Sequence, residues 1–495
     1  MKKIFLILIL ALFVRIGISV TLPLIDPTEG RYAQISQEMA LSGDWVTPRI
    51  WVNGEHIPFL GKPPVFFWCS AFFMKIFGIS EITARLPSLV AIMGLFFLIL
   101  NILSKYKGTE IAEETSLILV SSLFLFIMSS SVIVDILLMT FVAGASFCYF
   151  AFLKEESLKI KKRWSFSVFL LLALGFLTKG PVAIILFGMP VFMWTLLNNK
   201  WKDLRNHAWI LGLISFSLLV VPWFFLAEKA NPGFIHYFFV NENFLRYVQH
   251  NYGDLYGNGH VYPHGSALLM MFLTTLPWGF FAIKPIWKNI QQWRLNRDLK
   301  FLKDYFFIGF IINTIFWCFA KQLLMTYMLP SLPMFAVWLA SRQPFSQMKN
   351  NKTFNLPNIA GSLILLYSSL TVIFFVYLRV YSINGIQKVK GVIETAEMTM
   401  HIPKEKIKFL FLRRIPNSSY FYARGKIIPH PKESVDDSLK RAFDFSDEVC
   451  IVSKKAYVYR ISEKFFKKLS FVSKYSRWYI YRLKKDIDSD YSLEK

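Results

Sequence analysis

Long runs of apolar residues recur along the chain, and no other feature of the sequence restricts its fold as strongly. The first run follows Lys2 and Lys3 directly and extends over residues 4–21. About 20 helical residues are needed to cross the hydrocarbon core of a bilayer. In lipid the backbone polar groups must be satisfied within the segment itself, so each such run is predicted to be a transmembrane helix.

We predict about eleven spans of this kind, and up to thirteen if shorter apolar stretches also cross the membrane. The composition agrees, because 54% of the residues are hydrophobic, whereas soluble domains are about 45–50% apolar. The first span is expected to be uncleaved, and Arg15 within it is expected to extend its charge to the membrane surface. The predicted spans are residues 4–21, 82–103, 116–132, 135–153, 165–178, 180–198, 208–227, 264–284, 303–320, 322–341 and 357–380.

The basic residues of the short loops give these spans a direction. With the N-terminus inside, five loops that carry Lys and Arg fall in the cytoplasm, as such loops do in most membrane proteins. The net charge of +24 has the same explanation, because no nucleic-acid-binding motif accompanies it. We therefore expect no nucleic-acid partner. The cytoplasmic loops are residues 104–115, 154–164, 199–207, 285–302 and 342–356.

Two long loops, residues 22–81 and 228–263, fall on the outer side. Long irregular loops in a compact protein are usually functional or disordered, and the many aromatic residues here favour order. Residues 34–41 and 234–249 are predicted to form amphipathic helices at the membrane surface.

The chain changes character after residue 380, where it stops being membrane-like. Short runs typical of strands alternate with a helical segment, which indicates a small α/β domain over residues 381–495. The predicted fold class is an all-α polytopic membrane protein over residues 1–380, with about 11–13 transmembrane helices, periplasmic amphipathic helices and this soluble C-terminal domain. The predicted strands are residues 408–412, 448–452 and 478–481, and the predicted helix is 435–443.

Polar motifs gather at the outer ends of the predicted spans. Ionisable groups at the membrane face are costly and often functional, although a single one of them is more often a solvated loop residue. The motifs are Asp26-Pro27-Thr28-Glu29-Gly30-Arg31-Tyr32-Ala33, Ser42-Gly43-Asp44-Trp45, Gly61-Lys62-Pro63-Pro64, Ala84-Arg85-Leu86-Pro87, Leu177-Thr178-Lys179-Gly180-Pro181, Asn241-Glu242-Asn243-Phe244-Leu245-Arg246-Tyr247 and Thr326-Tyr327-Met328-Leu329-Pro330.

In this order, the motifs resemble those of the lipid-linked-sugar glycosyltransferases of the C-type fold, among them the bacterial aminoarabinose transferases of lipid A and the protein O-mannosyltransferases. The resemblance covers about residues 1–340. It implies a polyprenyl-phosphate sugar as donor, with undecaprenyl phosphate as the bacterial carrier. It also implies a multi-pass protein of the bacterial inner membrane whose active site and C-terminal domain face the periplasm, and we expect a monomer.

Such a transfer needs a cationic cradle for the lipid phosphate, an apolar groove for the polyprenyl chain and, for a hydroxyl acceptor, a carboxylate base. An acceptor that is itself a phosphate needs no strong base. Arg85 is expected to hold the first outer loop through a carboxylate. The catalytic candidates are Glu29, Asp26 and Asp135. The candidates for binding substrate by charge-assisted and other hydrogen bonds are Arg31, Tyr32, Lys62, Lys179, Arg246 and Tyr327.

Three positions depart from the family pattern. Thr28 replaces an aspartate, so catalytic duty would fall on Glu29 or Asp26. Gly61 replaces a glutamate and Asn243 a histidine that the resemblance ties to zinc, which argues against that metal site.

No cofactor is assigned, and the four cysteines form no CxxC pair. A divalent metal at His250, Asp254 and His260 stays open as an alternative, although acceptor or sugar binding is favoured for their loop.

The predicted function is an inverting glycosyltransferase that moves a sugar from polyprenyl phosphate to a periplasmic acceptor, with lipid A or lipopolysaccharide favoured. The alternative acceptor is a Ser or Thr of a protein. A transporter or flippase of the lipid-linked sugar is the alternative of another class. Transporters place their binding groups near the membrane midplane and often show inverted repeats, whereas the charges here gather on one side.

Overall fold

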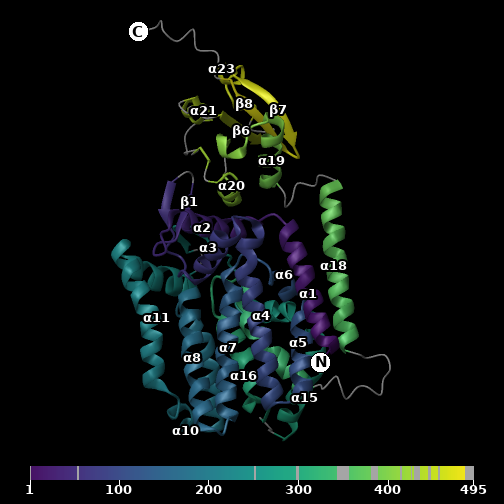
Figure 1. The fold of residues 1–495 in the computed structure, drawn as a ribbon. Coiled ribbons are helices and arrows are strands. Elements are labelled where there is room, and N and C mark those ends of the chain that lie inside the picture. Colours follow the sequence, from purple (N-terminus) through teal and green to yellow (C-terminus); the bar gives the residue numbers. More distant parts are fainter. Residues whose placement is uncertain are drawn as a thin grey trace.

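The computed structural model describes residues 2–52, 55–249, 252–296, 300–342, 356–380, 388–412, 415–424, 426–428, 435–443, 448–454 and 458–484. A bundle of long helices forms one end of the molecule and a small sheet forms the other, with a layer of short elements between them (Figure 1). The structure therefore has a bundle, a surface layer and a sheet domain stacked in that order.

Among the described residues, four helices of the bundle are long and apolar enough to cross a membrane: Ile4–Thr21, Glu81–Tyr106, Val134–Lys154 and Trp209–Ala230. Apolar residues predominate along these helices, as expected for helices surrounded by lipid and by other helices. The helices of the bundle are α1 (Lys2–Thr21), α4 (Glu81–Tyr106), α5 (Thr109–Val120), α6 (Leu123–Met128), α7 (Val134–Lys154), α8 (Leu158–Lys179), α9 (Val182–Asn198), α10 (Trp201–Arg205), α11 (Trp209–Ala230), α14 (Ser266–Thr274), α15 (Gly279–Asn296), η2 (Lys300–Lys303), α16 (Tyr305–Cys318), α17 (Leu332–Arg342) and α18 (Leu356–Val380).

Two of the predicted spans are interrupted. The predicted span 116–132 breaks at Ser121 and Ser122, whose hydroxyls donate to carbonyls one turn back, a bond that competes with the regular helix. The predicted span 264–284 breaks between α14 and α15. The breaks meet, because Leu123 N donates to Leu276 O at 3.0 Å and the Trp278 indole donates to Ser121 Oγ at 3.1 Å. Irregular backbone at membrane depth is tolerated where protein satisfies it in this way.

Two further elements differ from the prediction. The predicted span 322–341 begins as a 3-10 segment, η3 (Met325–Ser331), which contains Pro330 and turns into α17. Proline cannot donate a backbone hydrogen bond, which fits this irregular start. The apolar helix α3 (Val65–Phe77) lies within the first outer loop, where the sequence indicated no helix.

The predicted surface helices are confirmed as helices. The first is α2 (Thr28–Ser42). The second is a continuous helical run made of α12 (Phe234–His236), the π-helical η1 (Tyr237–Leu245) and α13 (Arg246–Val248). Two short hairpins complete this layer, one of β1 (Arg49–Val52) with β2 (Glu55–Pro58) and one of β3 (Gly253–Asp254) with β4 (Gly257–Asn258).

The C-terminal region holds a four-stranded sheet in the order β5-β6-β8-β7, with β5 and β6 parallel and the other pairs antiparallel. The predicted strands and the predicted helix over 435–443 are confirmed, and β7 is an additional strand. The division of the chain at residue 380 stays a prediction. The elements are α19 (Lys388–Met400), η5 (Lys404–Lys406), β5 (Ile407–Phe411), α20 (Asn417–Tyr422), α21 (Val435–Phe443), β6 (Glu448–Lys454), α23 (Glu463–Phe466), β7 (Leu469–Tyr475) and β8 (Trp478–Leu483).

Strand β6 is buried on both sides because each face of the sheet is covered. Cys450 and Val452 join an apolar core that also includes side chains of α19, α2 and α3. Val449 and Ile451 point the other way, into a core shared with α21, as the period of two along a strand requires. One apolar core therefore continues from the sheet domain into the surface layer of the bundle.

Candidate active site

A buried ion pair joins two helices of the bundle. Asp135 lies in the first turn of α7, where the helix dipole stabilises a carboxylate, and Lys179 is the last residue of α8, where the dipole stabilises a cation. Lys179 Nζ donates to Asp135 Oδ1, and Thr326 Oγ1 donates to Oδ2 at 2.9 Å. Lys179 Nζ also lies 3.7 Å from the centre of the Tyr327 ring. Both charged side chains are less than a tenth exposed.

Gly180 explains how α8 can end with a lysine held at this place. Its φ of +77° lies in a region that other residues rarely adopt. A Cβ there would also lie 2.5 Å from the Phe238 ring. Pro181 then precedes the first residue of α9. The Lys-Gly-Pro sequence is thus a tight helix-to-helix turn packed against η1.

A second charged group surrounds Glu242, which is buried on η1. Lys62 Nζ donates to Glu242 Oε1 and, at 2.7 Å, to Gly61 O. Arg246 Nη1 donates to both Glu242 oxygens at 2.6 and 2.7 Å, and its Nε donates to Gln322 Oε1 at 3.0 Å. One carboxylate therefore holds two of the predicted phosphate ligands side by side.

Tyr327 links the two charged groups. It interacts electrostatically with Asp135, Lys62, Arg246 and Glu242, so the two charged groups lie near each other. With Lys179, the group contains three cations and two carboxylates, which leaves one positive charge. We call these five charged residues and Tyr327 the central cluster.

Tyr32 of α2 lies beside the central cluster. It interacts electrostatically with Asp135, Glu242 and Tyr327. Its ring packs against Phe67 with the ring centres 5.6 Å apart. Burial raises the pKa of the Tyr32 hydroxyl well above its usual range, so this hydroxyl stays protonated and can donate a hydrogen bond.

Glu29 lies in a different, closed network. Its Oε1 accepts from Arg85 Nε and Val132 N at 3.3 and 2.9 Å, and its Oε2 accepts from Arg85 Nη2 and Ile25 N at 2.8 and 3.0 Å. The remaining Arg85 donors reach the carbonyls of Ser19, Leu22 and Pro23.

A carboxylate accepts about four hydrogen bonds, so all acceptor positions of Glu29 are occupied. The predicted carboxylate pairing of Arg85 is present, and four hydrogen bonds fix Glu29 at the start of α2, while its catalytic role stays a prediction.

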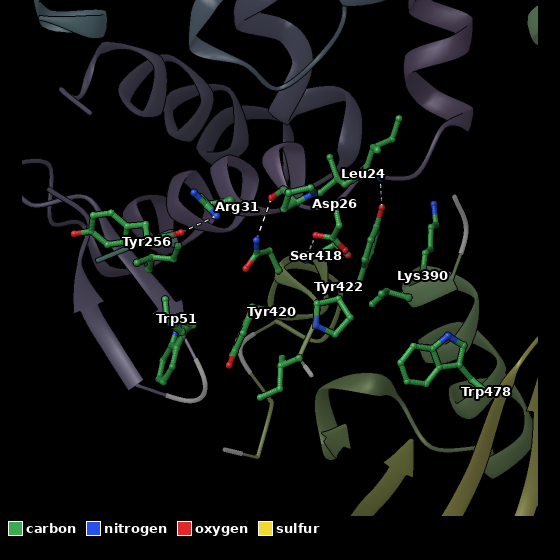
Figure 2. A pocket seen from close by; sticks show the side chains of 18 of the residues that line it. Leu24, Asp26, Arg31, Trp51, Tyr256, Lys390, Ser418, Tyr420, Tyr422 and Trp478 are labelled. Carbon is green, nitrogen blue, oxygen red and sulfur yellow. Dashed lines mark hydrogen bonds between the residues drawn. The ribbon is translucent and has the colours of Figure 1, made fainter. Parts of the chain in front are cut away.

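Asp26 and Arg31 line a separate cavity of about 640 Å³ between α2, β1 and the C-terminal region. Figure 2 shows Asp26 against Ser418 and Arg31 against Tyr256. Ser418 donates to Asp26 through its backbone N at 2.9 Å and through its hydroxyl. Arg31 Nη2 donates to the carbonyl of Tyr256 at 3.3 Å. Among the described residues, no carboxylate forms an ion pair with Arg31. We call this space the interdomain cavity.

Aromatic rings and cations from both parts of the chain line the interdomain cavity. Trp51 of β1 stacks on Tyr420 of α20, with ring centres 6.0 Å apart and ring planes 14° apart. Lys454 lies over the Trp478 ring at 5.3 Å. Such flat apolar faces beside cations suit a sugar that carries a negative charge.

The surface loop that contains Tyr256 also positions Lys62. The Tyr256 hydroxyl donates to Pro58 O and accepts from Leu60 N, both at 2.7 Å. Its ring packs on Phe59 with the ring centres 4.6 Å apart. The chain just before Lys62 is therefore fixed by the second outer loop.

The residues at the two positions that the family resemblance ties to zinc, Gly61 and Asn243, are not suitable metal ligands. Gly61 has no side chain, and the Asn243 amide donates to Phe238 O at 2.7 Å. His250 and the side chain of Asp254 lie outside the described residues, and His260 is exposed. Within the described part of the chain, no three His, Cys, Asp or Glu side chains form a metal-binding group.

Several contributors to these sites were not predicted from the sequence. Glu242 could have been found, since it lies four residues before Arg246 on a helix and such residues face each other. Thr326 opens the motif that contains Tyr327, whereas Gln322 has no sequence signal beyond its nearness to that motif. Ser418 contacts a residue 392 positions away, and no local pattern reports such a contact.

Comparison with known proteins supplies independent findings. A family model described as dolichyl-phosphate-mannose-protein mannosyltransferase matches residues 2–238. Undecaprenyl phosphate-alpha-4-amino-4-deoxy-L-arabinose arabinosyl transferase 2 of Proteus mirabilis is 28% identical over 320 residues, which cover 64% of this chain and 54% of that protein. The transferase of the same name from Aeromonas hydrophila is 27% identical over 321 residues, or 64% and 56% of the two chains. The chain spans about half the length of the curated relatives it matches.

A solved structure resembles the whole chain. The crystal structure of ArnT from Cupriavidus metallidurans bound to undecaprenyl phosphate superposes with a TM-score of 0.75. The superposition covers 97% of each chain at 20% sequence identity. The two proteins therefore share one fold over nearly their full length.

Proposed function

We propose that this chain, which is related to the lipid-linked-sugar glycosyltransferases of the C-type fold, is itself a glycosyltransferase that uses an undecaprenyl-phosphate sugar. The observation that carries the proposal is the central cluster, in which Lys62, Lys179 and Arg246 converge with one positive charge in excess. A phosphate leaving group is stabilised by cations that are already in position before it forms.

Asp135 is the proposed base or sugar-orienting group. Its two oxygens are held by Lys179 and Thr326, so the carboxylate is fixed before substrate binds. Lys62 has three N–H donors, and its described contacts use two of them. The third is available to a phosphate oxygen. Tyr327 and Tyr32 supply further donors at the edge of the cluster.

The proposed reaction is a single displacement. The acceptor oxygen forms a bond to the anomeric carbon while the bond from that carbon to the phosphate oxygen breaks. Undecaprenyl phosphate leaves as an anion, and the configuration of the anomeric carbon inverts. A hydroxyl acceptor would give its proton to Asp135, whereas a phosphate acceptor is already an anion and needs no base.

We assign the acceptor to the interdomain cavity, on the periplasmic side of the inner membrane. The relatives named above are aminoarabinose transferases, and an anionic saccharide such as the headgroup of lipid A fits walls that carry Arg31, Lys454 and stacked aromatic rings. The Asp26 carboxylate, which already accepts a hydrogen bond from the Ser418 hydroxyl, would accept another from an amine or a hydroxyl of a bound sugar.

Transfer to a protein hydroxyl is the second candidate. It is favoured by the family model, whose description names a protein mannosyltransferase, and by the presence of a fixed carboxylate that could serve as base.

Mass spectrometry of lipid A and of periplasmic glycoproteins separates the two candidates. A deletion strain should lose one sugar from lipid A, and the wild-type gene should restore that sugar. The Lys62→Met and Asp135→Asn variants should insert into the membrane normally but should not restore it. Loss of sugar from a protein with unchanged lipid A would favour the second candidate. Full activity of both variants would contradict the assignment of the central cluster.

A further inference from the structure

Arg15 is buried inside the bundle, contrary to the expected extension to the membrane surface. Its side chain is 7% exposed. Its Nη2 donates to Ile127 O at 2.8 Å and to Ser130 Oγ, and the guanidinium lies 5.0 Å from the centre of the Phe126 ring. Its Nε is buried without a hydrogen-bond partner. The arginine is thus held in place but incompletely satisfied.

No carboxylate among the described residues forms an ion pair with Arg15. Glu29 is the acid that interacts with it electrostatically, yet both Glu29 oxygens are occupied by Arg85 and two backbone amides. Buried charges are normally paired, because an unpaired one loses its hydration without compensation. Arg15 therefore lacks an anion.

An apolar groove of about 340 Å³ leads to Arg15 between α1 and α4, with α5 and α6 as its floor. This volume is in the range of ligand pockets, about 300–1,000 Å³. Its walls expose large apolar side chains on the outer face of the bundle, including Phe5 at 66% and Phe97 at 71%. Arg15 lies six residues before the end of α1, about 9 Å below it, so an anionic headgroup would have to enter the groove to reach the guanidinium.

We propose that this groove is a binding site for an anionic glycerophospholipid of the leaflet next to the C-terminal domain. One acyl chain lies in the groove between α1 and α4, and the phosphate accepts hydrogen bonds from Arg15. Such a lipid would supply the anion that Arg15 lacks, and its acyl chain would fill the apolar groove.

The site is distinct from the one proposed for the sugar donor. None of Lys62, Lys179 and Arg246 lines the groove, and Arg15 makes no described contact with them. The lipid would therefore act on the junction of α1 and α6, just before the N-terminus of α7 and Asp135.

Melting temperatures of the full chain in an uncharged detergent test the proposal. Dioleoyl phosphatidylglycerol should raise the melting temperature of the wild-type protein by several degrees, whereas dioleoyl phosphatidylcholine and inorganic phosphate should not. Arg15→Met, which removes the cation and keeps the bulk, should lose most of this rise. Lys202→Gln, which removes an exposed cation of α10, should keep it. Native mass spectrometry should show fewer retained phosphatidylglycerol molecules on Arg15→Met than on the other two proteins.

Three outcomes would overturn the proposal. Phosphatidylglycerol could raise the melting temperature of Arg15→Met as much as that of the wild-type protein, or phosphatidylcholine could raise the wild-type melting temperature equally. The third is that Arg15 affects the melting temperature only when undecaprenyl phosphate is added. Undecaprenyl phosphate is instead expected to stabilise Arg15→Met as it does the wild-type protein, and to lose its effect in Lys62→Met. Failure of that second expectation would count against the proposed function and not against the phospholipid site.

Discussion

At the scale of single residues, Asp135 and Lys179 depend on each other. Both are buried, and each is the charge partner of the other. Breaking a buried pair by removing one member costs about 3–5 kcal/mol, because the other charge stays behind without compensation. Their contribution to stability and their proposed role in catalysis can therefore be separated by a paired substitution.

We predict that Lys179→Met lowers the free energy of unfolding by about 3–5 kcal/mol, and that Asp135→Asn combined with Lys179→Met recovers most of the loss. Neither variant should transfer sugar. Unfolding in detergent and a transfer assay on the same preparations measure the two effects. Equal destabilisation of the single and the double variant would contradict the buried pair.

A second prediction concerns Gly180. Its φ is +77° with ψ of −148°, and a non-glycine residue in this region costs about 1–3 kcal/mol. Gly180→Ala should lose at least this much stability and disturb Phe238, on the helix that carries Glu242, so transfer activity should fall as well.

Gly188→Ala is the matched control. Gly188 lies within α9 with open space around its Cα, and alanine is favoured over glycine in a helix by about 1 kcal/mol. This variant should be as stable as the wild-type protein or more so. A similar loss in both variants would refute the role of the turn.

At the scale of elements, α20 is fastened to the bundle by polar contacts. The Tyr422 hydroxyl accepts from Leu24 N at 2.7 Å and donates to Glu81 Oε1 at 3.2 Å. Gln37 Nε2 donates to Phe421 O at 3.2 Å. These contacts hold α20, one wall of the interdomain cavity, against α2, the segment before it and the start of α4, and Figure 2 shows the contact between Leu24 and Tyr422.

Tyr422→Phe should therefore destabilise the protein by about 1–3 kcal/mol, since the buried amide of Leu24 loses its acceptor. Tyr459→Phe removes a hydroxyl from a residue that is 76% exposed and should have no measurable effect. Protease sensitivity of residues 388–484 should increase only in Tyr422→Phe. An equal response in both variants would show that the contact does not hold the C-terminal region.

The sequence predicted most long elements, because span length and strand alternation are local properties. It did not predict the breaks at Ser121 and at Leu276, since the two irregular segments satisfy each other across the bundle. It also grouped Glu29 with Asp135, whereas the four hydrogen bonds to Glu29 come from Arg85 and from the backbone amides of Ile25 and Val132. Motif order indicates which residues gather at one end, but only the packing separates an anchor from the central cluster.

At the scale of the whole molecule, α2, β1, α20 and the sheet lie toward one end of the bundle (Figure 1), and the first three supply walls of the interdomain cavity. Helix α10, which lies in one of the basic short loops, is at the other end. If the C-terminal end faces the periplasm, a cysteine at exposed Glu405 should react with a membrane-impermeant maleimide in cells with a permeabilised outer membrane. A cysteine at exposed Ser157, between α7 and α8, should react only after lysis.

Both substitutions are made after the four native cysteines are replaced by alanine. If Ser157→Cys were labelled in unlysed cells and Glu405→Cys were not, the C-terminal end would face the cytoplasm. That result would contradict a periplasmic site for the sugar donor.

Arg85 has a consequence for the order in which the chain is assembled. Its guanidinium is the hydrogen-bond partner of three carbonyls at the end of α1 and of Glu29 at the start of α2. Until α4 has been synthesised, these groups lack their arginine partner. The first helix can therefore enter the bilayer early. The end of this helix becomes fixed only after residue 85 has been synthesised, so the two ends of the first outer loop take their final positions together.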